Sequence, residues 1–145
     1  ELSPPALFGP GVDTVKMDTA VPLASVRAFL AGVEEIAARL APGSVPYLFG
    51  HVGDGNIHAH VLPPPDDPGW PDRKPAVQAA LDRLTWELGG TISAEHGVGR
   101  LLVDRIAGQK PTIELELTAA IKDLLDPGHR LNPGKTVPEP PAPPG

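Results

Sequence analysis

Cysteine is missing from this sequence of 145 residues, which excludes a disulfide framework, a thiolate nucleophile and a zinc site built on cysteine. No apolar run approaches the ~18 residues of a membrane span, and the chain does not open with the basic and apolar segments of a secretory signal. Positive charge is scarce, because 12 lysines and arginines stand against 18 acidic residues. Since contacts with phosphates need a basic face, nucleic acid is not expected as a partner.

The sequence contains 20 prolines and 16 glycines, and their clusters indicate the boundaries between its predicted segments. Residues 1–17 are broken by both and are predicted to be an N-terminal loop, a truncated element. Five of the last eight residues are proline, so residues 136–145 are predicted to be a disordered tail. The remaining residues, 18–135, are predicted to form one domain with a real core. Because the chain begins at Glu1, we expect a processed product or an excised piece of a larger protein.

Hydrophobic periodicity predicts an α+β fold with helices on one face of a small antiparallel sheet. Apolar residues recur every three or four positions from Leu23 to Leu40, which indicates an amphipathic helix. Asp54-Gly55 between two β-like runs is typical of a hairpin turn. The predicted strands cover residues 18–21, 47–52, 57–62 and 91–93, and the further helices cover 75–88, with Pro75 in the first turn, 101–106 and 112–125.

Three of the five histidines cluster at positions 51, 58 and 60. If Asp54 and Gly55 are the central turn residues, His51 lies directly opposite His58, and His60 shares their face of the sheet. Two such imidazoles can converge on one divalent cation. The same pattern also fits a polar pair on a solvated face, so the spacing alone leaves both interpretations open.

Two further segments carry candidate residues. Glu95 and His96 are adjacent, and glycines flank them. The pair could supply a carboxylate ligand and a general base. The same pattern also fits an incidental pair in a flexible loop. Gly97-Val98-Gly99 lacks a third glycine and a long preceding strand, so it is a poor dinucleotide fingerprint. From the residues alone, the segment 126–135 is predicted to form two successive turns that follow a helix. Lys16 is predicted only to be a surface lysine.

Together, these segments resemble one protein family. Residues 49–58 read FGHVGDGNIH, similar to the family pattern F/G-H-x-G-D-G-N-x-H, and residues 89–99 read GGTISAEHGVG, similar to G-G-x-x-S-G-E-H-G-I-G. Residues 125–135 resemble L-D-P…L-N-P-G-K, and residues 16–22 resemble K-x-D-x-x-x-P. The family is that of the FAD-linked 2-hydroxyacid oxidases and dehydrogenases, the glycolate oxidase D-subunit, D-lactate and D-2-hydroxyglutarate dehydrogenase branch of the vanillyl-alcohol-oxidase-like flavoproteins.

The resemblance implies a role for each matching residue. It implies that a divalent metal, zinc or manganese, is held by three residues, namely His51, His58 and Glu95. It makes His96 the catalytic base that takes the hydroxyl proton while the α-hydrogen leaves as hydride to the flavin. It places near the substrate Lys16, His60, where some relatives carry asparagine, and Ser3. It places near the flavin Asn132 and Asn56.

The family's FAD-binding domain precedes this region and is not in the sequence, so FAD is expected to be held mainly by that absent domain. We therefore expect the C-terminal part of an FAD-dependent enzyme that oxidises a small 2-hydroxy acid, with a ferredoxin-like core. Its partners are then the substrate and the FAD-binding domain of the same protein, with a homodimer and a cytoplasmic location as further predictions. The alternatives are a stand-alone metal-binding module, or a small metal-dependent hydrolase in which Glu95 or His96 activates water.

Overall fold

The computed structural model of this chain describes residues 12–135. The predicted substrate contact of Ser3 and the predicted disorder of residues 136–145 lie outside the described residues. The chain divides into two compact units, the first ending at Glu95 and the second beginning at His96. Strands occur in the first unit, whereas the regular elements of the second unit are helices.

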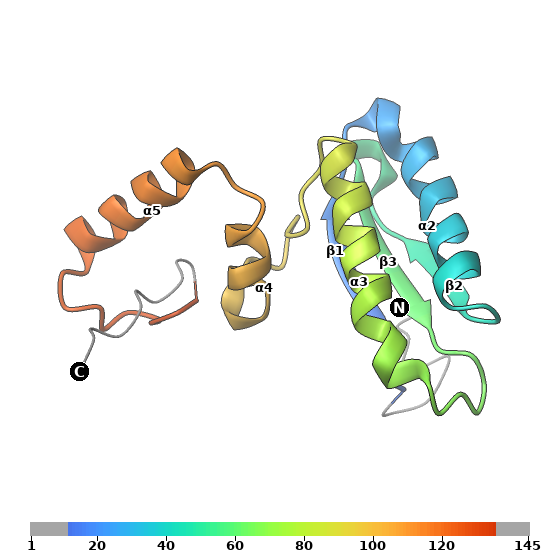
Figure 1. Cartoon of the computed structure of the whole chain (residues 1–145). Helices are drawn as coiled ribbons and strands as arrows, with labels where there is room; N and C mark the ends of the chain where they lie inside the picture. Colours follow the sequence, from blue (N-terminus) through green and yellow to red (C-terminus); the bar gives the residue numbers. More distant parts are fainter. Residues whose placement is uncertain (1–11, 136–145) are drawn as a thin grey trace. The chain divides into compact units, whose positions relative to one another are not determined.

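The order of elements along the chain follows the predicted one with revised ends, except that residues 91–93 do not form the predicted strand (Figure 1). The first unit contains β1 (Val15–Ala20), the short 3-10 helix η1 (Leu23–Ser25), α2 (Val26–Leu40), β2 (Val45–Phe49), a second 3-10 helix η2 (Val52–Asp54), β3 (Asn56–Leu62) and α3 (Trp70–Glu87). The second unit contains α4 (Gly99–Ala107) and α5 (Thr112–Leu125). None of the described helices has the length and apolar character needed to cross a membrane.

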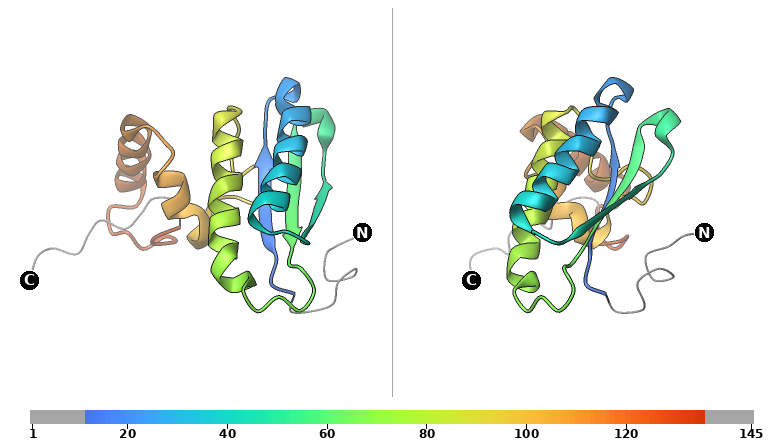
Figure 2. Two further views of the ribbon diagram at one scale, coloured as in Figure 1. Left: turned by 45° about the vertical axis from the view of Figure 1, so that its right-hand side comes forward. Right: turned by 90° about the vertical axis from the view of Figure 1, so that its right-hand side faces the viewer.

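The sheet is antiparallel, with strand order β1-β3-β2, so β3 is the central strand. Alternate residues of β3, namely Ile57, Ala59 and Val61, are at most 2% exposed. Helices α2 and α3 lie side by side on one face of the sheet and cover this apolar row (Figures 1 and 2). Because side chains alternate along a strand, His58 and His60 lie on the opposite face. The predicted α+β class is confirmed.

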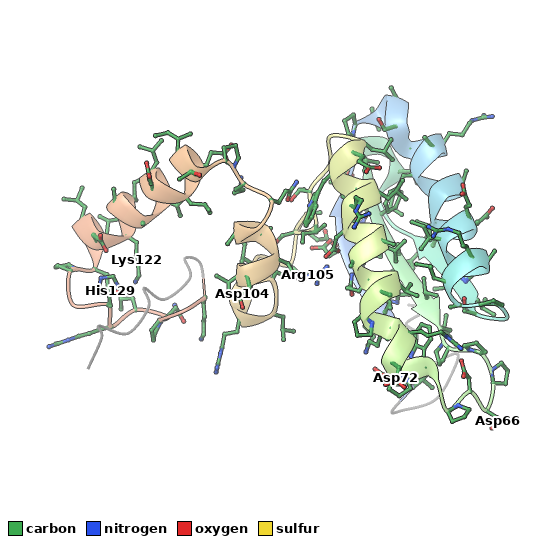
Figure 3. The ribbon with its side chains drawn as sticks, viewed as in Figure 1. Asp66, Asp72, Asp104, Arg105, Lys122 and His129 are labelled. Carbon is green, nitrogen blue, oxygen red and sulfur yellow. The ribbon has the colours of Figure 1, made fainter. Side chains whose placement is uncertain are left out.

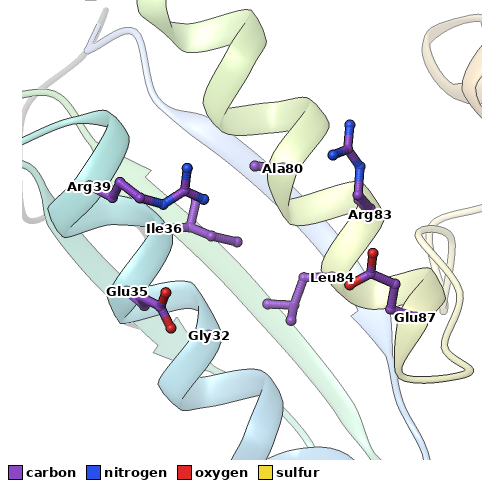
Figure 4. Close-up of a pocket in the computed structure, with 8 residues that line it drawn as sticks. All are labelled: Gly32, Glu35, Ile36, Arg39, Ala80, Arg83, Leu84 and Glu87. Carbon is purple, nitrogen blue, oxygen red and sulfur yellow. The ribbon is translucent and has the colours of Figure 1, made fainter.

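The two helices and the sheet share one apolar core. Phe29 and Val33 of α2 and Val77 and Leu81 of α3 are completely buried, and each such burial stabilises the fold by about 1.5–3 kcal/mol. On the outer side the helices leave a groove of about 340 Å³. Figure 4 shows its lining, which is Gly32, Glu35, Ile36, Arg39, Ala80, Arg83, Leu84 and Glu87. This groove belongs to the helical layer, so the sheet separates it from the two histidines of β3.

Helix α3 begins five residues before the predicted start at Pro75, which lies inside the helix. The Asp67 carboxylate accepts the Gly69 backbone N–H at 3.0 Å and so organises the turn that leads into the helix. Trp70, the first helical residue, is only 3% exposed, and its indole N–H donates to a backbone carbonyl at 2.5 Å. The first turn is therefore fixed by a tertiary contact that helical periodicity does not reveal, and Pro71 takes the early position predicted for Pro75.

The predicted register of the hairpin is wrong by two residues. Phe49, rather than His51, lies opposite His58. The reason is that β2 ends at Phe49, Gly50 adopts a φ of 147°, and residues 52–54 form η2 in place of a continued strand. A shift of two residues keeps every side chain on its predicted face, because the strand repeat is two residues. Strand β1 likewise starts at Val15, inside the segment predicted to be loop.

In the second unit, the turn that follows α5 is organised by Asp126. Its carboxylate accepts the backbone N–H groups of Arg130 at 3.0 Å and Leu131 at 2.8 Å, and it pairs with the Lys122 ammonium. Lys122 also donates to the Leu131 carbonyl at 2.6 Å. Figure 3 labels Lys122 and His129 in this part of the chain. The hydrogen bond from Lys122, followed by the bond from Leu131, lowers the pKa of Asp126 from 3.8 to about 2.

Gly55 provides a test of the loop that precedes β3. Its φ is 81°, and a Cβ atom there would lie 2.1 Å from the Val21 carbonyl oxygen. We therefore expect Gly55→Ala to lower the free energy of unfolding by at least about 1–3 kcal/mol, measured by urea denaturation. Gly53→Ala is the matched control, because a Cβ atom at Gly53 has nothing within 4 Å. Equal stability of the two variants would contradict this account of the loop.

The lowered pKa of Asp126 predicts that the turn after α5 loses stability in acid. Because its pKa is lower in the folded chain, its contribution to stability is present above the ordinary value of 3.8 and is lost as the pH falls through about 2. Amide exchange of Arg130 and Leu131, followed by NMR, should lose protection over that pH range. Asp126→Asn should weaken protection already at neutral pH and remove the acid step. Asp104→Asn, an exposed change on α4 (Figure 3), should leave the step in place.

Candidate active site

The open face of the sheet carries two rows of side chains that run across the three strands. The pairing of β1 with β3 and of β3 with β2 fixes both rows. Neighbours within a row have Cβ atoms about 4.5–5.5 Å apart. The first row consists of Asp18, His58 and Phe49, and the second of Lys16, His60 and Tyr47.

The segment after α3 returns to the edge of β1. Residues 91–93 form isolated bridges with β1, in place of the predicted strand. Ala20 exchanges two backbone hydrogen bonds with Thr91, at 3.0 and 2.8 Å. The Glu95 backbone N–H then donates to the Asp18 carboxylate at 2.9 Å. These bonds place Glu95 beside the row that contains His58.

His58 lies between two carboxylates. Its Nε2 atom is 3.0 Å from Glu95 Oε1, and its Nδ1 atom is 3.7 Å from Asp18 Oδ1. The His58 and Asp18 side chains are nearly buried, at 10% and 7% exposed, whereas the Glu95 side chain is 44% exposed. Each of the three residues offers a ligand atom within 4.8 Å of the others. The arrangement is a compact His-carboxylate cluster that opens toward solvent at Glu95.

This donor set fits a divalent transition metal. The separation of His58 Nε2 from Glu95 Oε1 is 3.0 Å, which suits an ordinary hydrogen bond. Two ligand atoms of a tetrahedral zinc ion, with bonds of about 2.0–2.2 Å, lie roughly 3.3–3.6 Å apart, so a small outward shift of these side chains would admit the metal. Asp18 faces the other ring nitrogen, the position from which a carboxylate orients a metal-binding imidazole. Asp18 is not among the predicted site residues, and its signal in the sequence is the K-x-D spacing.

The third predicted ligand, His51, lies at the start of η2 and outside β2. Its Nδ1 atom is 3.9 Å from Glu95 Oε2, and its side chain is 70% exposed. Glu95 is therefore flanked by His51 and His58, although the two histidines do not face each other across the hairpin. Of the predicted ligand set, Glu95 and His58 belong to the group of side chains whose ligand atoms lie within 4.8 Å of one another, whereas His51 approaches Glu95 alone.

The remaining predicted residues are distributed over both units. His60 is half-buried and lies edge-on to Phe49, whose ring also contacts His58, with centroids 5.2 and 5.0 Å away. Lys16 is exposed beside His60. Asn56 is buried, and its backbone N–H donates to the Asp54 carboxylate. In the second unit, Asn132 has a φ of 47° and accepts a hydrogen bond from Lys135 at 3.1 Å.

His96 follows Glu95 directly, begins the second unit and is exposed. Gly97 and Gly99 both have positive φ, and α4 starts at Gly99. In the described chain, the segment directly before this glycine pair, residues 91–93, forms only isolated bridges with β1. The pair thus lacks the strand of a dinucleotide-binding unit.

Asp18 gives a direct test of this geometry. In Asp18→Ala the Glu95 amide loses its charged acceptor, and such hydrogen bonds contribute about 1.5–3 kcal/mol. We expect amide exchange at Glu95 to accelerate at least about tenfold, measured by NMR. Asp72→Ala is the charge-matched control, because Asp72 lies in the first turn of α3. Unchanged exchange at Glu95 in the Asp18 variant would show that this bond does not hold the segment.

Comparison with known proteins shows which protein family the chain resembles. The model of the FAD linked oxidases, C-terminal domain, matches residues 2–136. D-2-hydroxyglutarate dehydrogenase of Stutzerimonas stutzeri is 34% identical over 122 residues, which are 83% of this chain and 26% of that protein. Glycolate oxidase subunit GlcD of Escherichia coli K12 is 36% identical over 137 residues, which are 92% and 26%.

A mitochondrial D-2-hydroxyglutarate dehydrogenase of Danio rerio is 34% identical over 126 residues, 87% of this chain and 23% of that protein. The chain thus spans about a quarter of the length of these curated relatives. The family model covers nearly the whole chain, and the matched range includes the His-carboxylate cluster. The chain belongs to the family of the FAD-linked oxidases, as their C-terminal domain.

Proposed function

We propose that this chain is the substrate- and metal-binding part of an FAD-dependent oxidoreductase that converts a 2-hydroxy acid into the 2-oxo acid. The observation that carries the proposal is the contact of Glu95 with His58 on the open face of the sheet, backed by Asp18. Family membership supports the oxidoreductase chemistry. The names of the relatives, D-2-hydroxyglutarate dehydrogenase and glycolate oxidase, support a 2-hydroxy acid as substrate.

The metal would be held by His58 and Glu95, with His51 as the third ligand. A bound divalent cation would supply Lewis acidity, which lowers the pKa of an α-hydroxyl group. Asp18 would keep the Nδ1 proton of His58 in place, so that Nε2 presents its lone pair to the metal. Glu95 is the most exposed member of the His-carboxylate cluster. The substrate would therefore approach the metal from the side of Glu95.

His96 is the proposed base. It follows the proposed ligand Glu95 directly and is exposed, so its ring can be reached from solvent. In this proposal Glu95 binds the metal while His96 faces the hydroxyl group. A neutral imidazole nitrogen of His96 would take the hydroxyl proton. The electron pair of the O–H bond would then form the second bond of the carbonyl, and the electron pair of the α-C–H bond would leave with the hydride.

The hydride acceptor is the flavin. The described residues lack a strand followed by a glycine-rich loop and a helix, so we place the main FAD contacts in the part of the full-length protein outside this chain. Asn56 and Asn132 remain the residues proposed to lie near the flavin. A ferredoxin-like relationship is proposed from the order β1-α2-β2-β3-α3, followed by a segment that bridges to β1. Homodimer formation and a cytoplasmic location stay predictions.

Two substitutions in the full-length, flavin-containing enzyme separate the roles of the Glu-His pair. Glu95→Gln should lose the metal and partly regain turnover when metal is added in excess. His96→Ala should keep the metal and lose about 10²–10⁴-fold in turnover, the usual contribution of a general base. Metal analysis and steady-state kinetics on the two variants measure both effects.

His129→Ala, a histidine of the C-terminal turn, is the control and should change neither property. If His96→Ala loses the metal while Glu95→Gln keeps it, the two roles are reversed. If both variants retain metal and turnover, the pair is incidental. A flavin-independent hydrolytic activity that depends on Glu95 or His96 would favour the metal-dependent hydrolase instead.

A further inference from the structure

The groove between α2 and α3 has no role in the proposed reaction. It has a volume of about 340 Å³ and lies on the outer side of the helical layer (Figure 4). Its floor is apolar, because Ile36 is only 8% exposed and Ala80 and Leu84 are half-buried beside it. An apolar surface with a polar rim is typical of a contact with another protein surface. The question is which surface fits it.

The two helices meet closely at one level of the groove. A Cβ atom at Gly32 of α2 would lie 2.7 Å from Leu84 Cδ2 of α3, so the helices are in direct contact there. The two helices run in opposite directions (Figure 1). Each residue advances an α-helix by about 1.5 Å. The position of every other residue along the groove can therefore be counted from this helix contact.

Four charged side chains line the groove, two from each helix (Figure 4). On α2, Glu35 lies about 4.5 Å and Arg39 about 10.5 Å beyond the helix contact. On α3, Arg83 lies about 1.5 Å to the same side of the contact and Glu87 about 4.5 Å to the opposite side. All four are exposed, and none of these side chains forms an ion pair or hydrogen bond within residues 12–135. The charges thus alternate in sign along the groove and are available for a partner.

This order of charges is complementary to itself. The midpoint of the four positions lies about 3 Å beyond the helix contact. A two-fold axis through this midpoint, in the plane of the contact and perpendicular to the helices, reverses the order along the groove. It brings Arg39 of one copy to the level of Glu87 of the other copy, and Glu35 to the level of Arg83. A two-fold axis parallel to the helices would instead bring each charge to the level of its own copy, which is repulsive.

We propose that the groove between α2 and α3 is a homodimer interface, in which Arg39 and Glu87 of the two copies pair across the two-fold axis. Self-complementary charge favours a second copy of this chain, because a different partner gives no reason for this symmetry. The apolar floor supplies surface to bury, and the charges fix the register of the two copies. The sheet separates the groove from the His-carboxylate cluster, so both candidate active sites stay open. The inference is independent of the reaction that the enzyme catalyses.

Reversal of single charges tests the pairing in the full-length enzyme. Arg39→Glu brings two glutamates together at each of the two equivalent contacts, and Glu87→Arg brings two arginines together. Each variant should raise the dissociation constant of the dimer about 10–100-fold, measured by sedimentation equilibrium, because repulsion replaces attraction at both contacts. The difference from the wild type should shrink in about 1 M salt, where the screening length is only about 3 Å.

An equimolar mixture of the two variants separates charge pairing from structural damage. In a mixed dimer a glutamate faces an arginine at both contacts, so the mixture should recover the wild-type dissociation constant. A fluorescent label on one variant identifies the mixed species. Arg100→Glu on α4 is the charge-matched control and should leave the dimer unchanged.

Four results would overturn the proposal. They are a monomeric wild type, single variants that dimerise like the wild type, a mixture that does not recover, and a control variant that dissociates like the groove variants. Variants that lower the melting temperature without changing the oligomeric state would also overturn it. In that case, the rest of the full-length protein would cover the groove.

Discussion

The hydrogen bond from the Glu95 amide to the Asp18 carboxylate is the contact on which the candidate site depends. It joins residues 77 positions apart in the sequence, and β2, β3 and α3 lie in the segment between them. The same carboxylate faces Nδ1 of His58. One buried carboxyl group therefore sets both the position of a potential ligand and the orientation of the imidazole beside it. Asp18 can do so because β1 pairs with β3 and places it directly opposite His58.

Local patterns were enough to predict most elements and the faces of the strands. The helix over residues 112–125 has its predicted bounds, and the alternation around His58 and His60 gave the correct face of β3. The hairpin register was wrong, because the Asp54-Gly55 signal does not show that residues 52–54 form a 3-10 turn. The error left the face unchanged, but it removed the predicted opposition of His51 and His58.

Other features depend on long-range contacts that no local pattern carries. The early start of α3 follows from the burial of Trp70 and its bond to Asp13, far away in the sequence. The contribution of Asp18 becomes visible only once the segment after α3 is placed beside β1. The row of Lys16, His60 and Tyr47 likewise joins residues of three strands, which no local pattern brings together. Helix α5 has apolar residues at helical spacing, but the structure exposes Ile113, Leu117 and Ile121.

The two edges of this sheet have a consequence for solubility during folding. An open edge strand offers unpaired backbone groups that recruit other strands and cause aggregation. On β2, Pro46 removes one backbone donor, and β2 is short. On β1, the backbone hydrogen bonds between Ala20 and Thr91 occupy part of the edge. The sheet can thus leave one face open to a ligand while giving neighbouring molecules little backbone with which to extend it.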